Sequence, residues 1–203
     1  MYKASKEGRK DIIDLMLLND DYSEFDLIKG ACEGGHVDII NMINSVDYNY
    51  KLAHACFGGH LALVKMMIDL GANDFNWGLY FACKGGHIEV INMMISLGAD
   101  DFNWGLRGAC RGGHVEIVKM MISLGADINY YICSDNIEVV KLFIDTEMPY
   151  EIIYEGDNIE IVKLLLEKGA NEYIRGLLGA CRGGQYKIVE LFLSIHNYDI
   201  DEY

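Results

Sequence analysis

Apolar residues recur along the chain at helical spacing, in pairs of short segments separated by glycines. In one such pair, Leu106, Ala109 and Cys110 fall at i, i+3 and i+4, which predicts a helix of about two turns with one apolar face. A longer second helix is predicted by the apolar positions that follow: Ile117, Val118, Met121, Ile122 and Leu124. The pattern therefore predicts two amphipathic helices joined by a turn.

The turn between the two helices carries the sequence Gly-Gly-His. Gly113 is suited to end the first helix because glycine adopts positive φ at no steric cost, and His114 then stands where the second helix begins. Asp135-Asn136 and Asp157-Asn158 replace the turn in two units, and these residues also tolerate left-handed geometry and cap helices. Gly125-Ala126 is predicted to end the second helix in the same way.

The helix pair is repeated along the whole chain of 203 residues. With the turn histidine as the register mark, successive units lie 27, 24, 27, 27, 22, 22 and 27 residues apart. The register residues are Arg9, His36, His60, His87, His114, Asn136, Asn158 and Gln185. We expect one domain of eight units, at about 1–22, 23–48, 49–72, 73–99, 100–126, 127–148, 149–170 and 171–203.

Charge and hydropathy narrow the range of partners. The formal net charge of −14 repels the phosphates of nucleic acids and anionic lipid surfaces, so we expect neither class of partner. No apolar run approaches the length of a membrane span, and the N-terminal segment lacks the apolar core of a signal peptide. The chain is therefore expected to be intracellular, with its cysteines as free thiols.

Histidine and cysteine are the ligands that zinc prefers, but their arrangement argues against a metal site. Five cysteines share one position of the unit and should lie in single file, roughly 10 Å apart, which suits neither a disulfide nor a shared metal. These are Cys32, Cys56, Cys83, Cys110 and Cys181, and we expect them to be small buried residues. Cys133 is out of register and is the thiol most expected to react.

Catalytic chemistry is not indicated either. The register position of His36, His60, His87 and His114 accepts Arg, Asn or Gln in other units, which indicates hydrogen bonding to backbone rather than acid–base work. Because an active site needs one unique constellation and none stands apart from the repeat, we predict no enzymatic activity, catalytic residue, metal or cofactor.

The segment Ala109–Asp127, ACRGGHVEIVKMMISLGAD, resembles the ankyrin repeat family. That family's unit is about 33 residues long, so the units here lack about six, and the loss falls between the second helix and the next first helix, where the family projects a hairpin loop. Trp104-Gly105-Leu106-Arg107 also replaces the family's Thr-Pro-Leu-His motif. Shortened arrays of this kind resemble those of large DNA viruses, which implies a protein-binding α-solenoid in the host cytoplasm.

In a solenoid, the residues that vary between units face the partner, because the repeated ones build the stack. The varying first-helix positions are Lys29, Gly30 and Glu33, then Ala53, His54 and Phe57, then Tyr80, Phe81 and Lys84, then Arg107, Gly108 and Arg111. Aromatic residues and arginine are typical of interface hot spots. We predict that Phe57, Trp77, Tyr80, Phe81, Lys84, Trp104, Arg107 and Arg111 bind an acidic or amphipathic segment of a partner protein, a host protein if the chain is viral.

Two alternatives remain open at this point. Trp77 and Trp104 are placed at the start of their first helices, where they would pack between units instead of contacting a partner. The C-terminal segment YKIVELFLSI is apolar on more than one side, so the chain is alternatively a structural or assembly protein that self-associates through its C-terminal repeat. In either case the expected fold is an all-α, ankyrin-like solenoid of stacked helix-turn-helix repeats with truncated hairpin loops.

Overall fold

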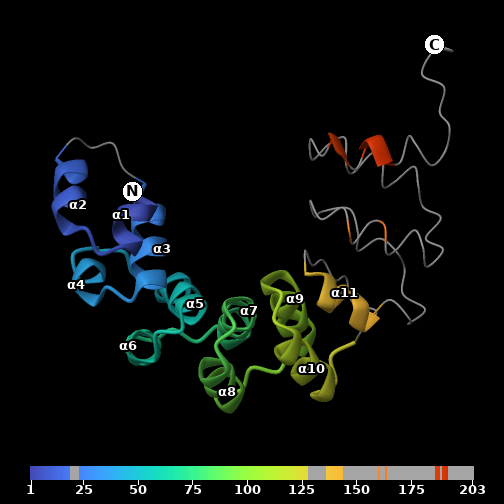
Figure 1. Cartoon of the computed structure of the whole chain (residues 1–203). Coiled ribbons are helices and arrows are strands. Elements are labelled where there is room, and N and C mark those ends of the chain that lie inside the picture. Colours follow the sequence, from blue (N-terminus) through green and yellow to red (C-terminus); the bar gives the residue numbers. More distant parts are fainter. Residues whose placement is uncertain are drawn as a thin grey trace, which may run out of the picture. The chain divides into compact units, whose positions relative to one another are not determined.

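Helices account for every regular element in the described part of the chain, which confirms the all-α fold class (Figure 1). The structure is a computed structural model and describes residues 1–18, 23–127, 136–143, 160, 163, 186, 187 and 189–191. Two compact units are present, Met1–Ala126 and Asp127–Tyr203, and each is described by itself. The division into eight repeats in one domain stays a prediction.

The first unit is built from consecutive helix pairs, labelled in Figure 1. In chain order they are α1 (Tyr2–Lys6) with α2 (Lys10–Leu17), α3 (Glu24–Gly34) with α4 (Val37–Ile40), α5 (Tyr48–Gly58) with α6 (Leu61–Asp69), α7 (Phe75–Gly85) with α8 (Ile88–Ser96), and α9 (Phe102–Gly112) with α10 (Val115–Ser123). The first helix of each pair packs against the first helix of the next, and from the second pair on each second helix packs mainly on its own first helix. The row α1, α3, α5, α7, α9 is therefore the spine of this unit.

The helix lengths differ from the expectation. The first helix α9 has 11 residues and the second helix α10 has nine, whereas the apolar pattern predicts the second helix to be the longer. The reason lies at the start of α9, where Asp101 accepts a hydrogen bond from the backbone N–H of Trp104 and starts the helix well before Leu106. Trp104 is therefore the third residue of its helix and does not open it.

The apolar stripes form the core as predicted, with two exceptions. Leu106, Ala109, Cys110, Ile117, Val118 and Met121 are buried. Ile122 is only partly buried, and Leu124 is 39% exposed because it caps the end of α10. Burial of a side chain of the size of Leu106 or Met121 contributes roughly 1.5–3 kcal/mol to the free energy of unfolding. The same positions are buried in the two preceding pairs, including Met67 and Met94.

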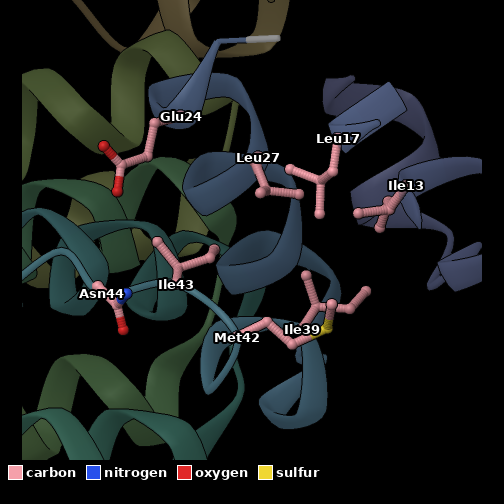
Figure 2. A pocket seen from close by; sticks show the side chains of 8 residues that line it. All are labelled: Ile13, Leu17, Glu24, Leu27, Ile39, Met42, Ile43 and Asn44. Atoms are coloured by element: carbon pink, nitrogen blue, oxygen red, sulfur yellow. The ribbon is translucent and has the colours of Figure 1, made fainter. Parts of the chain in front are cut away.

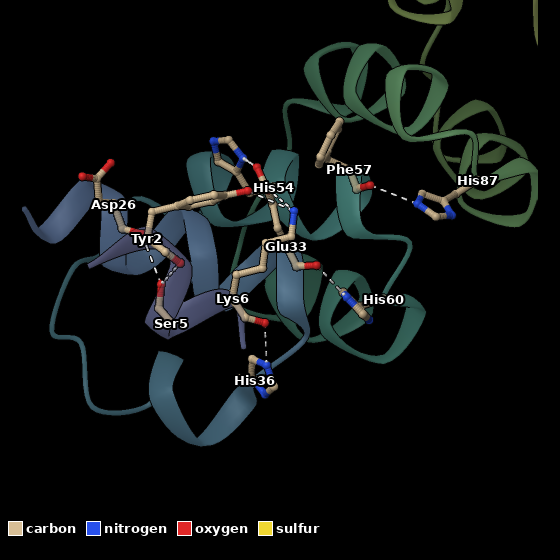
Figure 3. Close-up of polar contacts among 10 residues, drawn as sticks. All are labelled: Tyr2, Ser5, Lys6, Asp26, Glu33, His36, His54, Phe57, His60 and His87. Carbon is tan, nitrogen blue, oxygen red and sulfur yellow. Dashed lines mark hydrogen bonds and ion pairs between the residues drawn. The ribbon is translucent and has the colours of Figure 1, made fainter. Parts of the chain in front are cut away.

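The Gly-Gly-His turn locks each pair onto the pair before it. Gly113 has φ 73°, and a Cβ on Gly112 would lie 2.3 Å from the carbonyl oxygen of Lys84. His114 is the N-cap of α10 and donates from Nε2 to that same carbonyl oxygen, at 3.1 Å. The equivalent bonds run from His36 to Lys6, from His60 to Glu33 and from His87 to Phe57 (Figure 3). This confirms that the turn histidines bind backbone.

The opposite edge of the stack, where the hairpin is missing, is held by asparagine. The Asn76 side chain accepts hydrogen bonds from the backbone N–H groups of Asp100 and Asp101 in the next linker, at 2.9 and 3.0 Å. Asn49 does the same for Asn73 and Asp74, at 2.8 and 3.0 Å. In each linker, one asparagine side chain thus accepts hydrogen bonds from two backbone N–H groups. The linker itself is too short to form a hairpin.

In the second unit the structure describes the helix α11 (Ile137–Phe143). The Asn136 side chain accepts from the backbone N–H of Glu138 at 2.9 Å, which confirms that asparagine caps the helix where Gly-Gly-His is lost. Val139 and Val140 are buried. The predicted turn at Asp157-Asn158, the thiols Cys133 and Cys181 and most of the segment proposed for self-association lie outside the described residues.

Candidate partner-binding surface

The aspartates that cap the first helices also set which side chains face outward. Asp47, Asp74 and Asp101 accept hydrogen bonds from the backbone N–H of the residue three positions later, at 2.9, 3.0 and 3.0 Å. The donors are the aromatic residues Tyr50, Trp77 and Trp104. Helical geometry then places the third, sixth, seventh and tenth residues of each helix on one side. We call these positions of α5, α7 and α9 the first-helix face.

All eight residues predicted to bind a partner lie on the first-helix face. On α7 it consists of Trp77, Tyr80, Phe81 and Lys84, each partly exposed. On α9 it carries Trp104 and Arg111, both exposed, and Arg107, which is partly exposed. Phe57 is partly exposed at the tenth position of α5. The structure therefore brings the predicted residues together on three adjacent helices.

The aromatic rings of this face contact one another across the units. The ring centroids of Tyr50 and Trp77 lie 6.2 Å apart, and those of Tyr80 and Trp104 lie 5.6 Å apart. Phe81 makes edge contacts with the rings of Phe57 and Trp77. The tryptophans therefore pack between units, as the alternative interpretation expects, but 37% of Trp104 stays exposed.

Cationic groups border the aromatic rings. Arg111 donates from Nη1 to the hydroxyl of Tyr80 at 3.3 Å, and the Lys84 ammonium lies 5.8 Å from the centroid of the Phe57 ring. The helices α5, α7 and α9 contain four basic residues and no Asp or Glu, although the chain has 31 acidic residues. One of the four, Lys51, is buried and donates to the carbonyl of Ser45, so the face carries three cations.

Two ionisable residues of the varying set are not available to a partner. Glu33 and His54 are buried, and the Glu33 carboxylate accepts hydrogen bonds from the Tyr2 hydroxyl and the Lys6 ammonium, at 2.5 and 3.2 Å (Figure 3). His54 Nδ1 lies 3.0 Å from the same carboxylate. Burial alone raises the pKa of Glu33, but the hydrogen bonds from His54, Tyr2 and Lys6 outweigh it and lower the pKa to about 2.

The burial of Glu33 corrects its assignment to the variable surface, and its cause lies in the first unit. Tyr2 and Lys6 on α1 cover the position, whereas the tenth residue of α9, Arg111, is exposed. Gly30, Ala53 and Gly108 of the varying set are also buried, because helix packing there requires small residues: a Cβ on Gly108 would lie 2.3 Å from the Tyr80 carbonyl oxygen. Repeat alignment has no signal for these neighbours.

The cysteines have the properties of packing residues. Cys32, Cys56, Cys83 and Cys110 form no disulfide and are buried. Burial raises the pKa of Cys32 and Cys56 to about 12, so their thiols stay protonated at neutral pH. Within the ranges that the structure describes, no three His, Cys, Asp or Glu side chains form a group suited to hold a metal ion.

A hollow of about 180 Å³ lies between α2, α3 and α4 (Figure 2). Its walls are mostly apolar, and Glu24 is the one acidic or basic residue among those that line it: Ile13, Leu17, Glu24, Leu27, Ile39, Met42, Ile43 and Asn44. A single carboxylate provides no acid–base pair, so the hollow offers no constellation for catalysis.

Comparison with known families bears on the repeat directly. Residues 52–132 match the sequence model of the family described as ankyrin repeats, in three copies. Residues 52–132 of this chain therefore carry ankyrin repeats. The matched stretch includes most of α5 and all of α6 through α10, and therefore all of the first-helix face except Tyr50. Ankyrin repeats are generally protein–protein interaction modules and are typically not enzymes.

One solved structure similar to this chain is the crystal structure of the human ASB11 ankyrin repeat domain. It is 21% identical, with a TM-score of 0.44, and the similarity covers 84% of this chain and 83% of that one. A comparison with curated proteins finds no match. Over the described part of the chain, no helix has both the length and the apolar character needed to cross a membrane.

Proposed function

We propose that this chain is a non-enzymatic binding module that holds an acidic or amphipathic segment of a partner protein on its first-helix face. The observation that carries the proposal is the composition of three adjacent helices. α5, α7 and α9 present aromatic rings and three cations without one acidic residue, in a chain whose net charge is −14. Such a local reversal of charge attracts an acidic segment to this face while the rest of the surface repels it.

The arrangement of the rings supports binding through a preformed surface. Tyr80 is held by three neighbours, since its ring packs on Phe81 and Trp104 and its hydroxyl accepts from Arg111. A side chain already fixed in place loses little conformational entropy on binding, so more of the contact energy contributes to affinity. Tyrosine and arginine are also the residue types that most often dominate interfaces.

The proposal is tested with the partner itself. The full chain is used to capture binding proteins from a cytoplasmic extract, with host-cell extract as the first choice because the shortened repeats resemble viral ones. The affinity of the captured protein is then measured for the Tyr80→Ala and Arg111→Ala variants. We expect each to weaken binding at least tenfold, the level of an interface hot spot.

The control variant is Lys119→Ala, which removes one cation from the second helix of the same repeat. Lys119 pairs with Glu116 at 2.8 Å on the exposed side of α10, away from the first-helix face. We expect this variant to bind as well as the unmodified chain. Full affinity in both Tyr80→Ala and Arg111→Ala would remove the first-helix face from consideration.

A further inference from the structure

The first-helix face is bordered by acidic residues at one end of its helices and by basic residues at the other. At the N-terminal ends of α5, α7 and α9 stand the capping residues Asp47, Asp74 and Asp101. Each uses one carboxylate oxygen for its own helix, and an ionised carboxylate has a second oxygen and further acceptor sites. Asp47 and Asp74 are exposed and Asp101 is partly exposed. A row of negative charge therefore runs across the three helices.

The basic edge lies at the other end of the same helices. Lys84 and Arg111 occupy the last turns of α7 and α9, and the aromatic rings fill the space between the two edges. Ten residues separate Asp101 from Arg111, which corresponds to about 15 Å along the helix axis. An α-helix with its side chains is about 10–12 Å wide, so a helix laid across α5, α7 and α9 fits between the edges.

The repeat distance of the stack sets the spacing of the contacts. First helices packed side by side are roughly 10 Å apart. A partner helix rises about 1.5 Å per residue, so it advances about seven residues from one ankyrin unit to the next. Three apolar residues seven positions apart would thus meet the aromatic side chains of α5, α7 and α9 in turn, with Phe57, Phe81 and Trp104 among the contacts.

We propose that the partner segment is an amphipathic α-helix of about three heptads, with an apolar residue every seventh position, acidic residues along one flank and basic residues along the other. This inference rests on the proposed function and adds the partner's conformation and charge pattern. The acidic flank faces Lys84 and Arg111, and the basic flank faces Asp74 and Asp101. An extended acidic peptide would use the basic edge alone.

The test is a selection from a display library of helical peptides with a fixed leucine at every seventh position and flanks randomised among Glu, Lys, Gln and Ala. The full chain serves as the target. We expect the enriched peptides to carry Glu on one flank and Lys on the other. Enrichment of Glu on both flanks, or no enrichment, would overturn the proposal.

Variants of the chain then locate the two flanks. Asp74→Asn with Asp101→Asn removes the acidic edge and keeps both helix caps, because asparagine caps helices as well as aspartate does. Lys84→Gln with Arg111→Gln removes the basic edge. We expect each pair of substitutions to weaken the selected peptides at least fivefold, and Glu89→Gln with Glu116→Gln, on the exposed second helices, to leave affinity within twofold.

The two proposals fail in different ways. If the basic-edge variant weakens binding but the acidic-edge variant does not, the helix with two charged flanks is wrong and the binding surface stands. If neither variant changes the affinity, both proposals are overturned. Circular dichroism of each variant, compared with the unmodified chain, checks that a lost affinity does not come from a lost fold.

Discussion

Each helix pair is joined to the next along two edges, a turn edge and a linker edge, and the two edges use different interactions. At the turn edge, the Gly-Gly-His residues press against the preceding pair, and a Cβ on Gly34, Gly58, Gly85 or Gly112 would lie 2.2–2.5 Å from a backbone oxygen. At the linker edge, a Cβ on Gly71, Gly98 or Gly125 would meet nothing within 4 Å. The turn edge is fixed by close packing, and the linker edge by hydrogen bonds that the side chains of Asn49 and Asn76 accept from backbone N–H groups.

The difference explains why the linker is the place where the unit is shortened. Removal of residues from the turn edge would separate the turn histidine from the backbone carbonyl that accepts its hydrogen bond. The contact between units would then be lost. At the linker edge, two backbone N–H groups need an acceptor, and one asparagine provides it. The chain can therefore be shortened at the linker edge, where the glycines face open space. It cannot be shortened at the turn edge, where the glycines contact the backbone of the preceding pair.

The largest expected effect comes from a methyl group at the turn edge. Gly112→Ala places a Cβ 2.3 Å from the Lys84 carbonyl oxygen, and α7 and α9 must separate to admit it. We expect a loss of at least about 3 kcal/mol in the free energy of unfolding, measured by urea denaturation. The matched change at the linker edge, Gly98→Ala, meets no atom and costs only the strain of its positive φ, about 1 kcal/mol. Equal losses in the two variants would contradict the comparison.

Substitutions of a carboxylate at the two edges should differ almost as much in their effect on the free energy of unfolding. Glu33, next to the Gly-Gly turn, is buried among Tyr2, Lys6 and His54. Glu33→Gln removes the charge of a buried carboxylate that hydrogen bonds from three side chains stabilise, so we expect a loss of about 3 kcal/mol in urea denaturation. Asp74→Asn at the linker edge keeps the helix cap and should change stability by less than about 0.5 kcal/mol. A tolerated Glu33→Gln would show that the hydrogen bonds alone, without the charge, hold α1 in place.

The pH dependence of stability provides an independent test of the contacts that Glu33 makes with Tyr2, Lys6 and His54. The folded state lowers the pKa of Glu33 from its usual 4.5 to about 2, so the ionised form stabilises the fold fully above pH 4.5. That contribution falls as the pH drops from 4.5 to about 2, because the unfolded chain takes up the proton first. We expect the stability difference between the unmodified chain and Glu33→Gln, about 3 kcal/mol at neutral pH, to shrink towards zero near pH 2. A difference that does not vary with pH would mean that Glu33 acts through packing.

Most of the fold is predictable because the residues that recur in each unit are those that determine its backbone geometry. Gly113 with its positive φ, His114 at the start of α10 and the buried Leu106 follow from spacing alone. The length of the first helix does not, because its start depends on Asp101, which stands outside the apolar pattern. A search for Asp or Asn three residues before an aromatic at the same place in each unit would have found it.

The candidate site, too, is predictable only where its features follow from the repeat. The positions of Tyr80, Lys84 and Arg111 on one face follow from helical periodicity, and the structure brings them together. The burial of Glu33 does not follow, because it is caused by Tyr2 and Lys6, which come from an atypical terminal pair. Contacts between equivalent residues repeat with the sequence, whereas contacts with an end of the stack occur once.

The smallest effect tests the asparagine that replaces the hairpin. Asn76→Ala removes the acceptor for the backbone N–H groups of Asp100 and Asp101, but these groups lie near solvent and water can take its place. We therefore expect a loss of only about 1 kcal/mol in urea denaturation. Asn76→Asp keeps the acceptor oxygen but loses the donor to the Asp100 carboxylate, which it then repels, so we expect it to be destabilising. If Asn76→Ala cost as much as Gly112→Ala, the linker edge would be as tightly determined as the turn edge, and the shortened linker would need another explanation.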